Sequence, residues 1–154
     1  MNIFYLLLAL VAGAGMSVQT AINSRLSFGI GDQPLVASLV SFIVGTVCLL
    51  IVTLFQSDWS NVFAHAGQQP WWRWLGGALG AVFVFTIVFL APKMGISNVV
   101  FLLIIGQLAA GMVIDGYGLI QMPVRSIHWW KFAGMGVMLI GLALFMFGDK
   151  WFKQ

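Results

Sequence analysis

The fold is decided by Gln33–Ser57, QPLVASLVSFIVGTVCLLIVTLFQS, a stretch without a single charged side chain. A helix needs about 17–25 apolar residues to cross the hydrocarbon core of a bilayer, and this stretch is long enough. Four further uncharged stretches have comparable lengths: Met1–Ser24, Trp74–Pro92, Met94–Ile114 and Phe132–Gly148. Of all residues, 7% are charged and 61% are hydrophobic, and Glu is absent. The chain is therefore predicted to be a polytopic membrane protein.

Turn residues and tryptophans mark the ends of five predicted transmembrane helices. The polar run Asn23–Arg25 ends the first span, Pro92–Gly95 forms a tight turn, and Asp115 with the glycines after it ends the fourth. All seven Trp fall at span ends or in loops, which is typical of aromatic belts at membrane surfaces. The expected spans are residues 3–22, 35–55, 74–91, 96–114 and 132–148 of a single all-α membrane domain, residues 1–154.

Positive charges are distributed almost equally over the two sides of the membrane. The side of the N-terminus receives Arg73, Arg125 and Lys131, and the other side receives Arg25, Lys93, Lys150 and Lys153. An excess of Lys and Arg in cytoplasmic loops sets orientation, and this distribution gives almost no bias. We therefore expect the chain to insert both ways and to form an antiparallel dimer, a ten-helix inverted repeat like that of many secondary transporters. The alternative is a weak bias that simply reflects few charges.

The sequence carries no pattern for enzymatic or redox chemistry. Its one cysteine, Cys48, cannot form an intrachain disulfide. His65 and His128 lie in loops without the spacing of metal ligands, and no nucleophile–base pair or glycine-rich phosphate loop is present. The pI near 9.4 reflects seven bases against four acids in membrane-protein loops rather than a nucleic-acid surface. We expect a chain that is not an enzyme and needs no cofactor and no metal.

Polar and small side chains form stripes on three predicted spans. Gln19 and Asn23 follow Gly15 at four-residue intervals, so they share one face of the first span. Ser41 belongs to a stripe on the second span, and Gln107 lies near the middle of the fourth. Amides are costly to expose to lipid and should face protein or water. The amides of the first and fourth spans, together with the serine of the second, are the candidate substrate-binding residues: Gln19, Asn23, Ser41 and Gln107. Interhelical hydrogen bonding explains the amides equally well, and packing is the more common role of such a serine.

Glycines on the third and fifth spans predict close helix packing. Gly76 and Gly80 form a GxxxG pattern, and glycine recurs every seven residues at Gly134, Gly141 and Gly148. Small residues let helix backbones approach closely in lipid. Spans 1, 2 and 4 are therefore expected to turn their polar faces to a shared interior, while spans 3 and 5 pack, the fifth across the dimer.

Asp115 and Arg25 are the charged residues closest to membrane depth. An ionisable side chain inside a membrane is a functional candidate, and Asp115 is the one acid positioned to exchange a proton within the bundle. The alternative for Asp115 is a solvated position at the span end, or a pair with Arg25 or Arg125. Arg25 would hold an anionic solute, although an interfacial anchor is the more common role of such a side chain. Both residues are candidates for coupling or charge selection.

Six segments, in order along nearly the whole chain, resemble the drug/metabolite transporter superfamily in its short five-span YdcZ branch. They are Gly13–Asn23, Ser41–Thr46, Gly76–Ala81, Ala91–Gly95, Gly106-Gln107 and Ile114-Asp115. The resemblance implies an inner-membrane, multi-pass exporter. It also implies assembly as an antiparallel homodimer or with a paired paralogue of opposite orientation, because both occur in this branch, as do fused ten-span chains.

Two departures limit what the resemblance implies. The family tends to have Asp-His-Phe-Gly after its fourth span, and this chain has Asp115–Gly118 with no histidine, so no histidine role carries over. The related small multidrug resistance proteins have an essential Glu in their first span. This chain has Gln19 and Asn23 there, so their proton–drug antiport is not implied.

The leading hypothesis is a secondary transporter that exports a small organic solute by alternating access as an antiparallel dimer. Its site is expected between spans 1, 2 and 4 of both copies, with Gln19, Asn23 and Gln107 as polar contacts. Two alternatives stay open. One is a small dual-topology channel for an ion or neutral solute, and the other is an accessory subunit that packs against a larger membrane protein without transporting anything.

Overall fold

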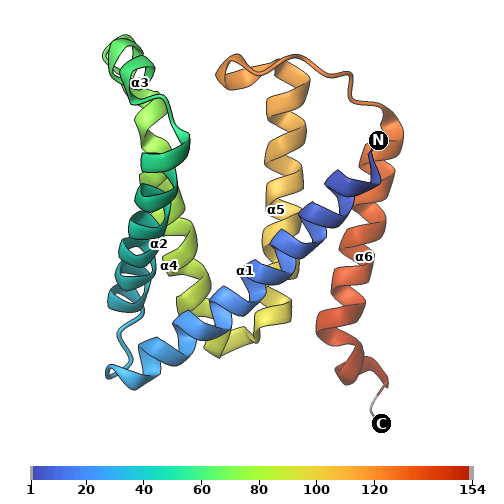
Figure 1. Ribbon diagram of the computed structural model, residues 1–154. Helices are drawn as coiled ribbons and strands as arrows, with labels where there is room; N and C mark the ends of the chain where they lie inside the picture. Colours follow the sequence, from blue (N-terminus) through green and yellow to red (C-terminus); the bar gives the residue numbers. More distant parts are fainter. Residues whose placement is uncertain (1, 153–154) are drawn as a thin grey trace. The chain divides into compact units, whose positions relative to one another are not determined.

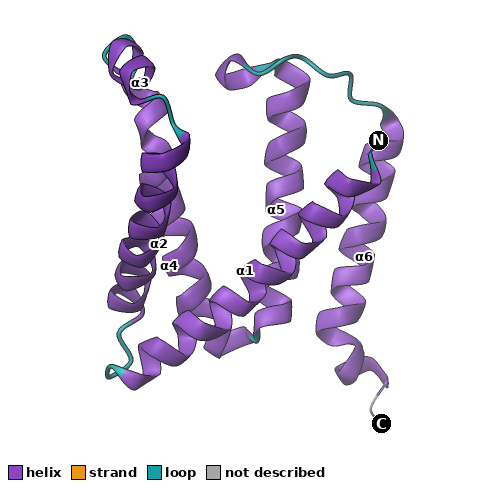
Figure 2. Cartoon of the chain, in the orientation of Figure 1, coloured by secondary structure: helices purple, strands orange, loops and turns teal. Residues whose placement is uncertain are grey.

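The computed structural model describes residues 2–152, apart from the side chains of residues 149 and 150, and every regular element in that part is helical (Figure 2). Within the described residues, five helices are long and apolar enough to cross a membrane, which confirms the predicted all-α chain with five candidate spans. Contacts between Cα atoms divide the chain into two compact units, Met1–Lys93 and Met94–Gln154. The single domain, and the interior shared by spans 1, 2 and 4, stay predictions. The charge count above includes Lys150 and Lys153, whose side chains lie outside the described part.

The first unit contains three long helices and, between the second and third of them, a connection that forms a short α-helix and a 3₁₀ helix (Figure 1). Its elements are α1 (Ile3–Gly29), α2 (Pro34–Gln56), α3 (Trp59–Ala66), the 3₁₀ helix η1 (Trp71–Leu75) and α4 (Gly76–Met94). A tight turn joins α1 to α2, with Gly31 at φ +85° and the backbone N–H of Gln33 donating to the carbonyl oxygen of Ser27 over 3.2 Å. Pro34 is the first residue of α2. Proline has no N–H group, and the N–H groups of the first helical turn have no acceptor within the helix, so no hydrogen bond is lost there.

The helices of this unit run further than the sequence predicted. Asn23, Ser24 and Arg25 lie inside α1 and do not end it, because the first two are packed against neighbouring elements and the helix continues to Gly29. Pro92 and Lys93 also lie inside α4, so the turn predicted there was wrong. The break comes at Gly95, whose φ of +84° is open to glycine and strained for other residues.

The second unit is a pair of packed helices joined by a long connection (Figure 1). Its elements are α5 (Ile96–Tyr117), the short 3₁₀ turn η2 (Leu119–Gln121) and α6 (Trp129–Phe152). The fourth span ends within the run Asp115–Gly118, as predicted, although the helix continues past Asp115 to Tyr117 and stops at Gly118, a left-handed cap with φ +61°. A Cβ at Gly118 would lie 2.7 Å from Cγ2 of Val124, so the connection folds back over the helix end at a distance that only glycine permits.

On α1, small and polar side chains are buried, while large apolar ones are exposed. Thr20, Asn23, Ser24 and Ser27 are all buried on α1, whereas Leu10 is 71% exposed. A soluble helix would show the reverse pattern. Because lipid solvates apolar side chains, this distribution fits a chain that sits in a bilayer.

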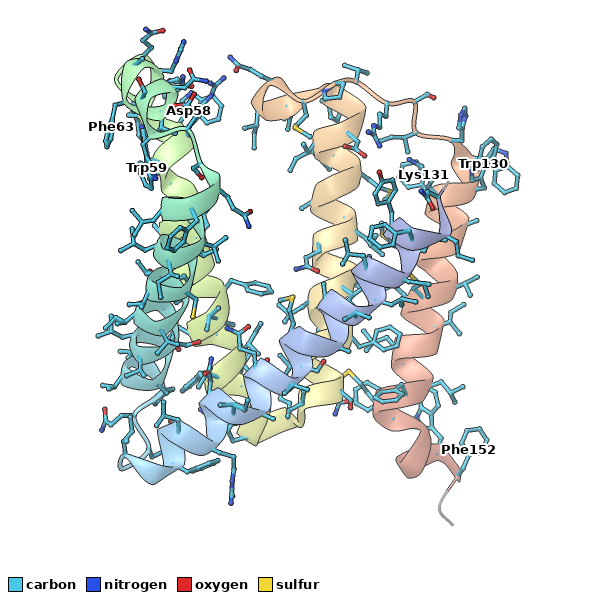
Figure 3. All side chains as sticks on the ribbon, viewed as in Figure 1. Asp58, Trp59, Phe63, Trp130, Lys131 and Phe152 are labelled. Atoms are coloured by element: carbon cyan, nitrogen blue, oxygen red, sulfur yellow. The ribbon has the colours of Figure 1, made fainter. Side chains whose placement is uncertain are left out.

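A short amphipathic helix, α3, follows the end of α2. The indole N–H of Trp59 donates to the carbonyl oxygen of Thr53 over 3.0 Å, which ties α3 to the last turns of α2. The rings of Trp59 and Phe63 lie 5.8 Å apart on the same side of α3 (Figure 3). Aromatic rings of this kind favour the membrane surface, and α3 is suited to lie along it.

Candidate functional site

A groove between α1 and α2 contains three of the predicted site residues. Nε2 of Gln19 donates to Oγ of Ser41 over 3.2 Å, and Asn23 lines the same groove one turn further along α1. The groove encloses about 390 Å³ and is otherwise lined by Gly15 and aliphatic side chains. It therefore offers a few neutral hydrogen-bonding groups within an apolar wall, which is the usual composition of a small-molecule site.

The α1–α2 turn sets the register that aligns these residues. Gln33 bonds back to Ser27 at the turn, and Gln19 meets Ser41 two turns deeper, so the two helices run antiparallel in constant register. Between these two contacts lies Ala37, which has no exposed surface at all. A methyl side chain there allows the close approach of the two backbones on which the groove depends.

Asn23 and Ser24 carry buried polar atoms without a partner. Asn23 is 5% exposed and Ser24 is 7% exposed, and neither Nδ2 of Asn23 nor Oγ of Ser24 has a hydrogen-bond partner in the described chain. Their buried neighbours differ, because the hydroxyls of Thr20 and Ser38 each donate to a carbonyl oxygen of their own helix over 2.8 Å. A buried unpaired polar group costs about 1–3 kcal/mol, so these two positions are where a missing partner would bind.

A second, much smaller cavity lies on the α4 side of the same residues. It measures about 10 Å³ and is lined by Gln19, Thr20 and Asn23 of α1 and by apolar residues of α4 such as Val88. This volume is about that needed for one water molecule. Asn23 and Gln19 therefore stand between a site for a single water and a groove large enough for a small organic molecule.

The second unit has a separate groove between α5 and α6. It encloses about 460 Å³ and receives Gln107 and Asp115 from α5 and Lys131 from α6. Asp115 is half-buried, and its backbone carbonyl accepts from the N–H of Arg125 over 2.8 Å. Lys131 lies in the first turn of α6, on the side toward α5 (Figure 3). This groove thus combines one carboxylate, one ammonium and one amide.

The structure groups the predicted site residues into these two sets. Gln19, Asn23 and Ser41 share the first groove, and Gln107 and Asp115 share the second. Arg25 is exposed on α1 and lines neither groove. Their roles in binding and coupling stay predictions.

The predicted packing glycines have different surroundings. A Cβ at Gly80 would lie 3.6 Å from the ring of Phe42 on α2, so this glycine faces a neighbouring helix. A Cβ at Gly76, Gly134 or Gly141 would meet no atom of the described chain within 4 Å, and one at Gly148 meets its own helix at Leu144. Any packing role of Gly134 and Gly141 therefore needs a partner other than the α5–α6 pair itself.

Sequence reasoning missed Lys131 and Ser24 as site residues. Lys131 is predicted from the sequence to lie in a loop, although it precedes Gly134 and Met138 at helical spacing and so begins the stripe that lines the α5–α6 groove. Ser24 is predicted to lie at the end of a span. The signal available for it was its place next to Asn23 in a helix that carries no charge before Arg25.

The comparisons with known proteins agree with this architecture. Residues 4–144 match the family described as "Putative inner membrane exporter, YdcZ". Comparison with curated proteins and with solved structures gave no match. The family match includes three of the five candidate membrane spans in full and most of the first and last. The chain therefore belongs to this exporter family and is a multi-pass protein of the inner membrane.

Proposed function

We propose that the chain exports a small organic solute by alternating access, as a secondary transporter built from two copies in opposite orientation. The family to which it belongs is described as one of exporters, which supports transport. The nearly even Lys and Arg distribution supports insertion in both orientations. Two inverted copies would give the inverted-repeat plan that many secondary transporters use.

The observation that carries the proposal is the buried, unpartnered amide of Asn23. A buried amide in a membrane helix is normally hydrogen-bonded, because an unsatisfied donor in an apolar environment is energetically unfavourable. Asn23 lines the α1–α2 groove one turn from Gln19, which supports a role for its N–H group as a donor to a solute oxygen. The site is uncharged, so the solute group it binds is a carbonyl, hydroxyl or similar polar oxygen.

Gly141 on α6 supports the second copy. A Cβ at Gly141 would meet no atom of the described chain within 4 Å, which suits the backbone of another helix. Gln107 is exposed near the middle of α5, where an amide facing lipid would be unfavourable. A two-fold axis in the membrane plane would bring the two copies of Gln107 together and pair them.

A flux experiment tests the proposal. The purified chain is reconstituted in liposomes loaded with a mixture of isotope-labelled amino acids, amines and sugars, and the solutes released are identified by mass spectrometry. Saturable release of a solute is expected, with a loss of release in Asn23→Leu. Conductance in single-liposome recordings would instead indicate a channel, and no release of any solute would indicate an accessory subunit.

Gly15→Ala provides the sharper variant, with Gly13→Ala as its matched control. A Cβ at either glycine meets no atom of the described chain within 4 Å, and both lie on α1, but only Gly15 lines the groove. The added methyl group should reduce release for Gly15→Ala and leave it unchanged for Gly13→Ala. Equal activity of both variants would exclude the α1–α2 groove as the solute site.

A further inference from the structure

The α5–α6 groove runs from the middle of a membrane span to one of its ends. Gln107, Gly111 and Asp115 follow one another at four-residue spacing along α5 and all line the groove. At a rise of about 1.5 Å per residue, Gln107 and Asp115 are separated by about 12 Å along the helix. This length is close to half of the roughly 30 Å hydrocarbon thickness of a bilayer. The groove therefore covers about one leaflet.

The walls of the groove leave room for a ligand. A Cβ at Gly111 or at Gly134, on facing helices, would meet no atom of the described chain within 4 Å. Met112, Met135 and Met138 form much of the remaining wall. Methionine side chains are flexible and adapt to irregular ligands, so the groove has an open middle between adaptable apolar sides.

Opposite charges lie at the outer end of the groove. Asp115 supplies a carboxylate and Lys131 an ammonium group, and the two line one cavity. Trp129 and Trp130 immediately precede Lys131, and Trp130 points away from the groove (Figure 3), which marks this end as the membrane surface. Charged side chains inside a membrane protein normally face a water-filled cavity rather than lipid. The groove is therefore suited to water and to a solute that carries both charges.

We infer that this groove is one half of a hydrated path for a small zwitterionic solute with an apolar body, completed by the same groove of a second copy. The ammonium group of the solute is held by Asp115 and its acidic group by Lys131. The inference rests on the antiparallel dimer of the proposed function. An in-plane two-fold axis through Gln107 joins the two half-grooves end to end, each about 12 Å long, into a path across most of the hydrocarbon core.

Single cysteines in a Cys48→Ser background test both parts of this inference, because Cys48 is the one cysteine of the chain. Gln107→Cys should form a disulfide between two copies on oxidation in native membranes. Gly111→Cys and Gly134→Cys should react with a charged, water-soluble methanethiosulfonate reagent more than about tenfold faster than Ala110→Cys and Gly136→Cys, because the reactive thiolate forms only in contact with water. The two controls are adjacent in depth and do not line the groove.

The outcomes separate the path from the dimer. A Gln107→Cys disulfide without faster labelling of the groove cysteines would overturn the hydrated path and leave the proposed dimer intact. Faster labelling without the disulfide would overturn the joining of two half-grooves, and with it the dimer as placed here.

Three probes with the same apolar body test the solute class. Phenylalanine should protect Gly111→Cys and Gly134→Cys from the reagent, whereas phenethylamine and 3-phenylpropionate should protect several-fold less, because each lacks one of the two charges. Protection should be lost in Asp115→Asn and in Lys131→Gln. Equal protection by all three probes, or by none of them, would overturn the zwitterion assignment.

Discussion

Nε2 of Gln19 on α1 donates a hydrogen bond to Oγ of Ser41 on α2 over 3.2 Å. The bond lies in the wall of the groove that also receives Asn23, and Gln19 remains exposed there. The contact that joins the two helices is thus also the contact that a ligand would compete for.

A double-mutant cycle should measure this bond. We expect Gln19→Leu and Ser41→Ala to show a coupling energy of about 0.6 kcal/mol and no more than about 1.7 kcal/mol, the range of interhelical hydrogen bonds in membrane proteins. Unfolding of the four variants in bicelles gives the value. Thr86→Val serves as a reference, because its hydroxyl bonds only to its own helix at Val82. Strictly additive single variants would show that the bond contributes nothing to stability.

Asn23→Leu should separate stability from transport. Replacing an unpaired buried amide with an apolar side chain of similar size removes an unfavourable term of about 1–3 kcal/mol, so the unfolding free energy should stay level or rise. Export should fall in the same variant. Thr20→Val is the control, since the hydroxyl of Thr20 is already paired with Met16. A marked loss of stability in Asn23→Leu would mean that the amide is paired in the membrane and is structural.

The sequence alone predicted the helices well and their ends poorly. The lengths of the uncharged stretches are enough to place five spans, because any helix that crosses a bilayer needs about 20 consecutive apolar residues. The ends depend on tertiary packing and on single backbone angles. Asn23 and Ser24 look like a polar terminus in isolation, yet they are buried within α1, and Pro92 looks like a breaker although the break is at Gly95.

The candidate site was predictable only in part, for a similar reason. Helical spacing placed Gln19 and Asn23 on one face of α1, and Gln107 and Asp115 on one face of α5, because residues at multiples of four share a face over a few turns. The partners from the second helix of each groove depend on the register of packing. The sequence alone does not determine that register in either groove. Ser41 was predicted because it belongs to a polar stripe on its own helix, whereas Lys131 was not predicted.

Gly95→Ala should destabilise the chain. Gly95 has φ +84° and ψ 144°, a region that costs a residue with a Cβ about 1–3 kcal/mol. Gly106→Ala, within α5 and with nothing within 4 Å of the added carbon, should instead be neutral or stabilising by about 0.5–1 kcal/mol. Thermal unfolding in detergent compares the two. An unchanged midpoint for Gly95→Ala would mean that the connection between α4 and α5 readily adopts another conformation.

Asp115→Asn should abolish accumulation of a solute against its gradient if the carboxylate carries the coupling proton, and it should leave exchange intact for solutes without an ammonium group, which do not need Asp115 for binding. Asparagine keeps the size and polarity of the side chain and removes its ability to take up and release a proton. Accumulation is measured as uptake driven by an imposed pH gradient, and exchange is measured as counterflow at equal pH on both sides. Asp32→Asn, in the α1–α2 turn, is the matched control. A mutant that still accumulates solute would remove Asp115 from the coupling step.

Reporter fusions should reveal two orientations of the chain. We expect a cytoplasm-active and a periplasm-active reporter, each fused after Gln154, to give comparable activity, because Lys and Arg are almost evenly divided between the two sides. Because the positive charges are so evenly divided, one added positive charge should change the ratio of the two orientations. Gln68→Lys, in the connection between α3 and η1, and Gln33→Lys, in the turn between α1 and α2, add it on opposite sides and should shift the reporter ratio in opposite directions. Activity of one reporter alone, unmoved by either lysine, would establish a fixed orientation. The inverted second copy would then have to be a different chain.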